Sequence, residues 1–458
     1  MSLGSESHQK PAGSAGRVGR AQGEARCEPA RDESRPARDE QTHWGPEDLL
    51  GQALAKRNMA AAWKRVKANK GSAGVDGRTV EQTEGYLKRH WPDIRQSLLL
   101  GTYRPSPVRR VQIPKLGGEY RELGIPTVVD RLIQQALLQV LQPVIDPTFS
   151  EHSFGFRPGR SAHGAVLLAH SYVQQGCTVV VDVDLEKFFD RVNHDILMER
   201  LARRIADKAV LWLIRKYLQA GIMDGGLQLE RHEGTPQGGP LSPLLANVML
   251  DEVDRELERR GHNFVRYADD CNVYVKSIAA GKRVLAGLRR CYAKLRLSVN
   301  EAKTAVALVW KRKFLGYCFW LSKTTGKVHR DVAAAALQRY RQRVSCLTRR
   351  QTGRSFDQIA KDLQAFMPGW KAYFRLTQTP STFRELDSWL RHRLRAIQLK
   401  FWCRGTTVFR ELRALGASVD LAAQVAAHAR RWWYCSANLV NRVLTNAYFD
   451  NFGIPRLC

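Results

Sequence analysis

The chain has 458 residues and a formal charge of +29 at pH 7, from 73 basic and 44 acidic side chains. Nucleic acid is the favoured partner, because so large an excess of one sign destabilises a compact protein unless a polyanion balances it. The apolar runs are too short for a membrane-spanning helix, and the 9 cysteines form neither a Cys-x-x-Cys pair nor a zinc-type cluster with histidine. We therefore expect a cytoplasmic protein, without a membrane partner, a disulfide framework or a zinc module.

Composition divides the N-terminal part of the chain in two. Residues 1–45 are rich in Gly, Ala, Ser, Pro and mixed charge and nearly lack large apolar side chains, which predicts a disordered basic tail. From Pro46 onward apolar residues such as Leu50 and Leu54 recur at helical spacing. Residues 46–100 are therefore predicted to form a helical extension.

A mixed α/β region follows over residues 101–328, and it carries acidic residues at an unusual place. Residues 178–185 have the apolar, β-branched pattern of a buried strand, yet they include Asp182 and Asp184. Burying an ionised carboxylate is costly unless a cation or a hydrogen-bond donor receives it. Because alternate strand residues share one face, periodicity alone does not choose between these two aspartates.

Two further carboxylates lie in FVRYADDCNVYVK, residues 264–276. Strand-like alternation on either side puts Asp269 and Asp270 at a hairpin turn. Aspartate is common in turns for reasons unrelated to chemistry. Beside one of the upstream aspartates, however, this pair would supply the hard oxygen ligands that two Mg²⁺ ions roughly 3.5–4 Å apart require.

Beyond residue 328 the chain becomes helical and basic. Ser355 and Gln358 form a capping pattern at the start of one helix, which Pro368 and Gly369 are expected to end. Arginines line up on one stripe of two other helices, opposite apolar residues. A charged stripe is usually a solvated face, but acidic residues that would balance these are scarce. RNA contact is therefore predicted for Arg339, Arg343, Arg350, Arg384, Arg391 and Arg395.

The last predicted unit, residues 403–458, mixes basic, aromatic and amide side chains. Single-stranded nucleic-acid surfaces have this composition, so a small basic nucleic-acid-binding segment is predicted. Trp432 and Phe449 would equally serve as the core of a small helical cap, and both interpretations stay open.

Taken in order, these motifs resemble the palm of reverse transcriptases, particularly those encoded by mobile group II introns. The resemblance rests on VQIPKLGGEYRELGIP, HSFGFRPGRSAHGAV, DLEKFFD, TPQGGPLSPLLANVML, YADD and FLGYCFW. Further on, GWKAYF resembles a signature of the maturase region, also called domain X. With no His/Asn-rich or paired-cysteine module following it, the chain resembles the compact bacterial type that lacks an endonuclease domain.

The resemblance implies an α+β right-hand polymerase. Fingers and palm would occupy residues 101–328, and an α-helical thumb and maturase domain would occupy residues 329–402. In the palm, the family register selects Asp184 as the partner of Asp269 and Asp270 in binding two Mg²⁺ ions. Leu185 would lend its backbone carbonyl to a metal.

The same resemblance implies the residues around the incoming nucleotide. Lys115 and Arg121, on either side of a Gly-Gly turn, would clamp the triphosphate, and Gln237 would line the dNTP pocket. Phe189 corresponds to the aromatic residue that blocks the sugar 2′-hydroxyl. The alternative, that Phe188 and Phe189 are plain core aromatics, is expected to hold for one of the two. Lys303 is a candidate proton donor to the leaving pyrophosphate, with a purely electrostatic phosphate contact as the alternative.

The implied function is DNA synthesis from dNTPs on an RNA template with a DNA or RNA primer. It would be coupled to binding the group II intron RNA and assisting its splicing and its insertion into target DNA in the bacterial cytoplasm, at the nucleoid. Two alternatives stay open: a free-standing reverse transcriptase used in defence or repair, and an RNA-binding splicing cofactor alone. The second would have lost its polymerase carboxylates, whereas this chain keeps all three.

Overall fold

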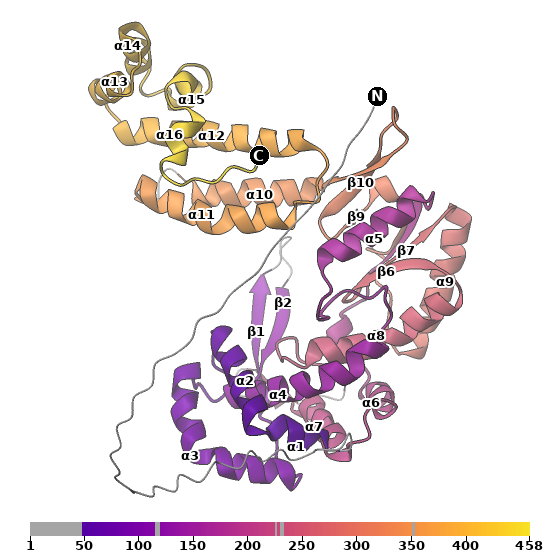
Figure 1. Cartoon of the computed structure of the whole chain (residues 1–458). Helices are drawn as coiled ribbons and strands as arrows, with labels where there is room; N and C mark the ends of the chain where they lie inside the picture. Colours follow the sequence, from indigo (N-terminus) through magenta and orange to yellow (C-terminus); the bar gives the residue numbers. More distant parts are fainter. Residues whose placement is uncertain (1–47, 115–119, 225–226, 230–232, 350–352) are drawn as a thin grey trace, which may run out of the picture. The chain divides into compact units, whose positions relative to one another are not determined.

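The computed structural model describes residues 48–114, 120–224, 227–229, 233–349 and 353–458 (Figure 1). The predicted tail over residues 1–45, Lys115 and Arg350 lie outside these residues. No described helix is long and apolar enough to cross a membrane. The domain boundaries predicted at residues 100, 328 and 402 stay predictions.

Helices make up the predicted N-terminal extension. Thr79 begins the third helix with a capping box, in which its hydroxyl accepts from the Gln82 amide and the Gln82 side chain accepts from the Thr79 amide. Leu50 and Leu54 of the first helix are buried in the main core, close to the long helix that follows the fingers strands. These helices are α1 (Leu49–Leu54), α2 (Lys56–Ala68), α3 (Val80–Leu99) and α4 (Val128–Ile145).

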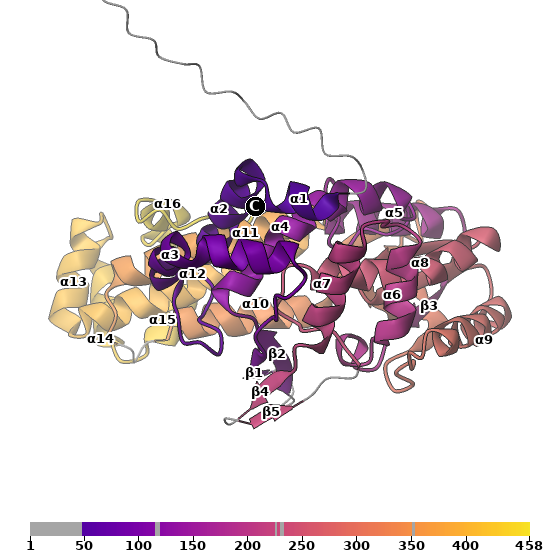
Figure 2. The same ribbon diagram turned by 90° about the horizontal axis from the view of Figure 1, so that it is seen from below.

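The described strands form three sheets. The fingers sheet has the order β2-β1-β4-β5. Its first two strands pair antiparallel, with Ile113 opposite Arg121, and β4 joins β1 in parallel. Figure 2 shows β4 and β5 continuing the ribbon of β1 and β2. The strands are β1 (Val108–Pro114), β2 (Tyr120–Ile125), β4 (Ile222–Asp224) and β5 (Leu227–Leu229).

The palm sheet has the antiparallel order β6-β7-β3-β8 and is covered on both faces. Val180 and Tyr274 face one way and share a core with α5, whereas their neighbours Val181 and Val273 face the core of α8 and α9. Cover on both faces explains the nearly continuous apolar run in β3. The elements are β3 (Val179–Val183), β6 (Asn263–Tyr267), β7 (Asp270–Val275), β8 (Ala305–Leu308), α5 (Ala162–Gln174), α6 (His194–Ala202), α7 (Lys208–Gln219), α8 (Ser242–Arg259) and α9 (Ile278–Lys294).

A small sheet leads from the palm into the helical region. Its strands, in the order β11-β10-β9, place Phe314, Tyr317 and Phe319 in the core that also holds α5. They are β9 (Lys313–Phe314), β10 (Tyr317–Leu321) and β11 (Val328–Val332). Short 3₁₀ turns in the chain are η1 (Asp146–Thr148), η2 (Phe188–Asp190), η3 (Val309–Lys311) and η4 (Val440–Arg442).

The C-terminal helices share a separate core, in which α10, α11 and α12 lie side by side (Figure 1). Phe449, near the C-terminus, is fully buried in it. The core therefore continues past residue 402 without a break, as the helical-cap interpretation requires. The helices are α10 (Ala334–Leu347), α11 (Phe356–Tyr373), α12 (Pro380–Trp402), α13 (Gly405–Ala414), α14 (Val419–Ala427), α15 (Trp432–Asn438) and α16 (Asn446–Asp450).

One predicted helix end is wrong. The sequence predicts that the helix ends at Pro368, but α11 continues through this proline to Tyr373. Met367 is fully buried just before the proline, and the Trp370 ring lies 4.5 Å from the Tyr340 ring just after it. Packing on both sides of Pro368 therefore outweighs the local loss of a backbone hydrogen bond.

Candidate active site

Strand pairing brings the predicted catalytic aspartates to one end of the palm sheet. Val183, the last residue of β3, pairs with Cys271 of β7, so that Asp184 and Asp270 follow directly at the same edge. Tyr267 pairs with Asp270 and closes a turn of two residues, whose first residue, Ala268, has φ +58°. The predicted hairpin at Asp269 and Asp270 is confirmed.

Asp184 is held by its backbone to the segment that carries Lys303. Its carbonyl accepts from the Asn300 amide at 2.8 Å, and its amide donates to the Thr304 hydroxyl at 3.2 Å. The Lys303 ammonium lies 3.6 Å from the Asp184 carboxylate. Leu185 forms the adjoining bridge to Val299, and that bridge uses the Asp184 carbonyl and the Glu186 amide.

Asp182 has different neighbours from Asp184. Arg312 donates from Nε (2.8 Å) and Nη2 (2.6 Å) to one Asp182 oxygen, and Nη2 also donates to the Lys303 carbonyl at 2.8 Å. In the amide orientation that satisfies both of its polar atoms, Asn272 donates to the other Asp182 oxygen at 2.9 Å. Burial raises the pKa of Asp182, and the hydrogen bonds and charge of Arg312 oppose that rise. Both Asp182 oxygens are thus occupied by protein donors.

Asp182, Asp184 and Asp270 line one cavity of about 850 Å³, together with Lys303 and Arg312. Asp270 is an exposed residue, but the neighbouring protein partly desolvates its carboxyl group. This desolvation, followed by the negative charges of Asp269, Asp182 and Asp184, raises the pKa of Asp270 to about 7. Carboxylates that oppose one another's ionisation are hard ligands suited to a divalent cation, so these residues fit the Mg²⁺ that the resemblance implies.

Asp269 lines a different cavity, of about 510 Å³. Among the described residues, no three His, Cys, Asp or Glu side chains are spaced to hold a metal together. The joint Mg²⁺ site of Asp184, Asp269 and Asp270 stays a prediction, and the charges of Asp269 and Asp184 both act on Asp270.

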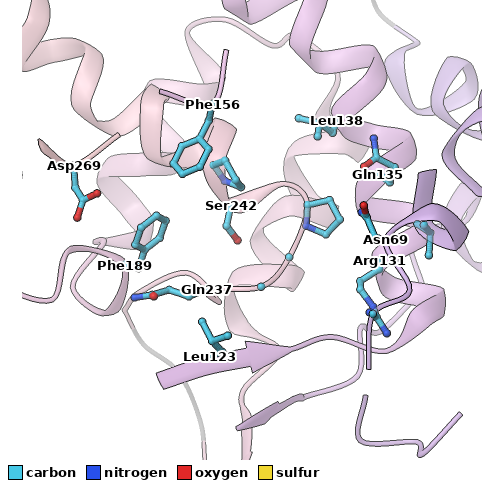
Figure 3. Close-up of a pocket in the computed structure, with 16 residues that line it drawn as sticks. Asn69, Leu123, Arg131, Gln135, Leu138, Phe156, Phe189, Gln237, Ser242 and Asp269 are labelled. Atoms are coloured by element: carbon cyan, nitrogen blue, oxygen red, sulfur yellow. The ribbon is translucent and has the colours of Figure 1, made fainter. Parts of the chain in front are cut away.

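The second cavity contains two of the predicted dNTP-binding residues. Figure 3 shows Phe189 and Gln237 on the side where Asp269 lies, with Arg131 and Gln135 on the opposite side. Phe189 lines this cavity, whereas Phe188 packs in the core at 5.1 Å from the Phe189 ring. Both phenylalanines are buried in the same core, and the sugar-discriminating role of Phe189 stays a prediction.

Backbone contacts hold the Gln237 loop against Phe189. The Thr235 amide donates to the Phe189 carbonyl at 2.7 Å. Gly238 approaches β2 so closely that an added Cβ would lie 2.4 Å from the Gly124 carbonyl oxygen. A side chain at position 238 would therefore push the loop out of the cavity wall.

The predicted triphosphate clamp stays a prediction. Lys115 lies outside the described residues, and for Arg121 the structure describes only the backbone in β2. Sequence patterns gave no signal for three other cavity residues, Phe156, Arg131 and Gln135. Phe156 lies in a recognised block, but its φ of +60° and its place near Phe189 depend on the fold.

The predicted RNA-binding arginines of α10 have the expected exposure. Arg339 and Arg343 are exposed, while Tyr340 and Val344 on the adjacent stripe are buried. Arg339 also lines the cavity that holds Asp184 and Asp270. RNA binding by Arg339 and Arg343 stays a prediction.

The predicted arginine stripe of α12 is wrong in part. Arg384 is exposed, but Arg391 is 2% exposed, and its guanidinium lies 3.4 Å from Asp450. Arg395 is half-buried and donates to the Leu444 carbonyl at 2.8 Å. The C-terminal segment packs over this part of the helix and takes the place predicted for RNA.

Comparison with known proteins identifies two families along the chain. Residues 113–319 match the family "Reverse transcriptase (RNA-dependent DNA polymerase)", and residues 337–416 match "Group II intron, maturase-specific domain". Protein YkfC of Escherichia coli (strain K12) is 40% identical over 208 residues, which are 44% of this chain and 55% of YkfC.

Two further similarities were found. Group II intron-encoded protein LtrA of Lactococcus lactis subsp. cremoris is 38% identical over 195 residues, which are 42% of this chain and 32% of LtrA. The matches thus span about half of YkfC and a third of LtrA. A chain in the solved structure "Partial Cas6-RT-Cas1--Cas2 complex" is 26% identical with a TM-score of 0.36, covering 54% of this chain and 42% of that one.

Proposed function

Because the chain belongs by both of its domains to the group II intron reverse transcriptase/maturases, we propose that it copies RNA into DNA and assists the splicing and mobility of a group II intron. One observation carries the polymerase half. Asp184 and Asp270 meet across paired strands in one cavity, and Asp269 on the same turn lines a second cavity with Phe189 and Gln237. The carboxylates that would bind the metal ions and the pocket that would bind the nucleotide would then adjoin at one turn.

Two Mg²⁺ ions, when bound, would supply the charge that activates the primer 3′-hydroxyl and stabilises the departing pyrophosphate. Asp184, Asp269 and Asp270 would hold them, with the Leu185 carbonyl as a further ligand. Phe189 would exclude the sugar 2′-hydroxyl, and Gln237 would position the nucleotide. Lys303, 3.6 Å from Asp184, is placed to meet phosphate oxygens or to give a proton to pyrophosphate.

The proposed partners are an RNA template with a DNA or RNA primer, dNTPs, the group II intron RNA and its target DNA, in the bacterial cytoplasm at the nucleoid. The maturase-specific match and the exposed Arg339 and Arg343 support RNA binding beyond the palm. An excess of 29 positive charges supports polyanion binding as a whole.

Two assays on one preparation test both halves. The first measures extension of a DNA primer on a generic RNA template, and the second measures splicing of the neighbouring intron RNA at a Mg²⁺ concentration too low for unassisted splicing. We expect activity in both. Extension without assisted splicing would favour a free-standing reverse transcriptase, and assisted splicing without extension would favour a splicing cofactor alone.

A further inference from the structure

A fully buried ion pair lies directly behind the catalytic turn. Arg266 of β6 and Asp254 of α8 are both 0% exposed. Arg266 donates from Nε at 2.8 Å and from Nη2 at 2.6 Å to the two Asp254 oxygens. Replacing a buried pair by apolar residues is often neutral or stabilising, so stability alone does not account for an arginine here.

The remaining arm of the guanidinium reaches the turn itself. Arg266 Nη1 donates to the Ala268 carbonyl at 2.9 Å and to the Asn247 side-chain oxygen at 2.8 Å. Ala268 is the residue with φ +58°, a conformation that side-chain-bearing residues rarely adopt. The Ala268 carbonyl thus accepts a hydrogen bond from a guanidinium that Asp254 and Asn247 also bind.

The same network fixes the segment beneath the turn. Asn247 donates to the Gly155 carbonyl at 2.9 Å. A Cβ on Gly155 would lie 2.2 Å from the Ala268 amide nitrogen, so the backbone of residue 155 packs directly against the turn. The next residue, Phe156, lines the cavity that contains Phe189 and Asp269.

We propose that Arg266 is a positioning residue, which holds the Ala268 carbonyl through its guanidinium and thereby fixes the turn that carries Asp269 and Asp270. Arginine suits this role because its planar fork binds a carboxylate and a carbonyl at fixed angles, whereas lysine offers one point charge. The inference rests on the proposed polymerase function for its catalytic consequence, but not for its structural one.

The test compares Arg266→Lys with Arg391→Lys. Arg391 is a matched control, because it is equally buried, lies beside Asp450, and donates to the carbonyls of Ile454 and Pro455 in the C-terminal core. A third protein, Arg266→Met with Asp254→Leu, removes the pair without leaving a lone charge. Each is studied as the full chain, below its own unfolding midpoint.

Amide hydrogen exchange across residues 267–270 is measured without nucleic acid. We expect faster exchange in Arg266→Lys and in the double variant, and exchange unchanged from the wild type in Arg391→Lys. In primer extension, we expect kcat of both Arg266 variants to fall about 100-fold, as displacement of reacting groups by about 1 Å does, while primer–template Kd and dNTP KM change less than about twofold.

Wild-type exchange at the turn in Arg266→Lys, or an equal loss of kcat in Arg391→Lys, would overturn the proposal. Recovery of both the unfolding midpoint and kcat in the double variant would do the same, because the pair would then serve stability alone. A wild-type protein without extension activity would refute the proposed function, and the exchange measurement would still decide the role of Arg266.

Discussion

Asp182 and Asp184 lie two residues apart, and their neighbours give them different chemistry. Both line the same cavity, but Arg312 and Asn272 occupy the two oxygens of Asp182, whereas Asp184 has the Lys303 ammonium 3.6 Å away. Strand periodicity predicted that Asp182 and Asp184 lie on the same face of the strand, but it did not predict which of them would bind metal. Arg312 lies 130 residues from its partner, so local sequence patterns do not predict this pairing.

Phe189 gives the clearest prediction at this scale. Phe189→Ala should raise incorporation of ribonucleotides relative to deoxyribonucleotides by about tenfold or more, because loss of one well-fitted contact changes discrimination by roughly 1–3 kcal/mol. Steady-state extension with matched rNTP and dNTP measures the ratio. Phe188→Ala is the control, since Phe188 packs in the core. An effect confined to the Phe188 variant would mean that the assigned register is wrong.

At the scale of single elements, α10 and α12 show what an amphipathic pattern can and cannot predict. Both have an apolar stripe beside an arginine stripe, and for α10 the arginines are exposed as expected. In α12 the same pattern fails, because the C-terminal segment covers Arg391 and Arg395. A stripe predicts which side faces the core, but it does not predict which later segment packs over the other side.

The arginines of α10 and α12 should therefore respond differently to substitution. Arg339→Gln with Arg343→Gln should leave the unfolding midpoint nearly unchanged, and should flatten the log–log salt dependence of RNA affinity by up to about 0.9 per lost phosphate contact. Arg391→Gln should instead destabilise the protein by roughly 1–3 kcal/mol, because the Ile454 and Pro455 carbonyls lose a buried donor while Asp450 keeps its ion pair with Arg456. Thermal unfolding and RNA titration in varied salt measure both. An unchanged salt slope in the double variant would show that its stripe is only a solvated face.

A buried carboxyl in the fingers predicts pH-dependent stability. Asp130 at the start of α4 accepts hydrogen bonds from the Tyr103 and Thr127 hydroxyls, but burial is the larger effect and raises its pKa to about 6. The folded state therefore binds this proton more tightly than the unfolded state, whose pKa is near 3.8. The stabilisation is complete below about pH 4 and is lost as pH rises through 6.

Asp130→Asn should remove this dependence, which is on the order of 3 kcal/mol for a shift of about two units. Denaturant unfolding of both proteins at intervals from pH 4 to 7 measures it. The wild type should lose stability relative to the variant as pH rises. A difference between the two proteins that is independent of pH would contradict the raised pKa.

For the whole molecule, sequence patterns predicted the order of parts better than their contacts. The palm strands, the hairpin turn and the helical region that follows are confirmed, because each depends on local periodicity and on motif order. The assignment of Asp269 and Asp270 to two different cavities, and the place of Phe156 beside Phe189, depend on packing between segments far apart in the chain. No local pattern encodes those contacts.

The central claim is that one turn of the palm carries a metal-dependent polymerase site, separate from the surface that binds intron RNA. Asp269→Asn tests it most directly, in Mg²⁺-dependent extension of a DNA primer on a generic RNA template, with intron-RNA affinity measured on the same preparation. Asp195→Asn is the control, because Asp195 is an exposed residue of α6 paired with Arg215. We predict loss of extension by at least about 100-fold in the Asp269 variant, with RNA affinity unchanged within about twofold. Substantial Mg²⁺-dependent extension by that variant would contradict the account.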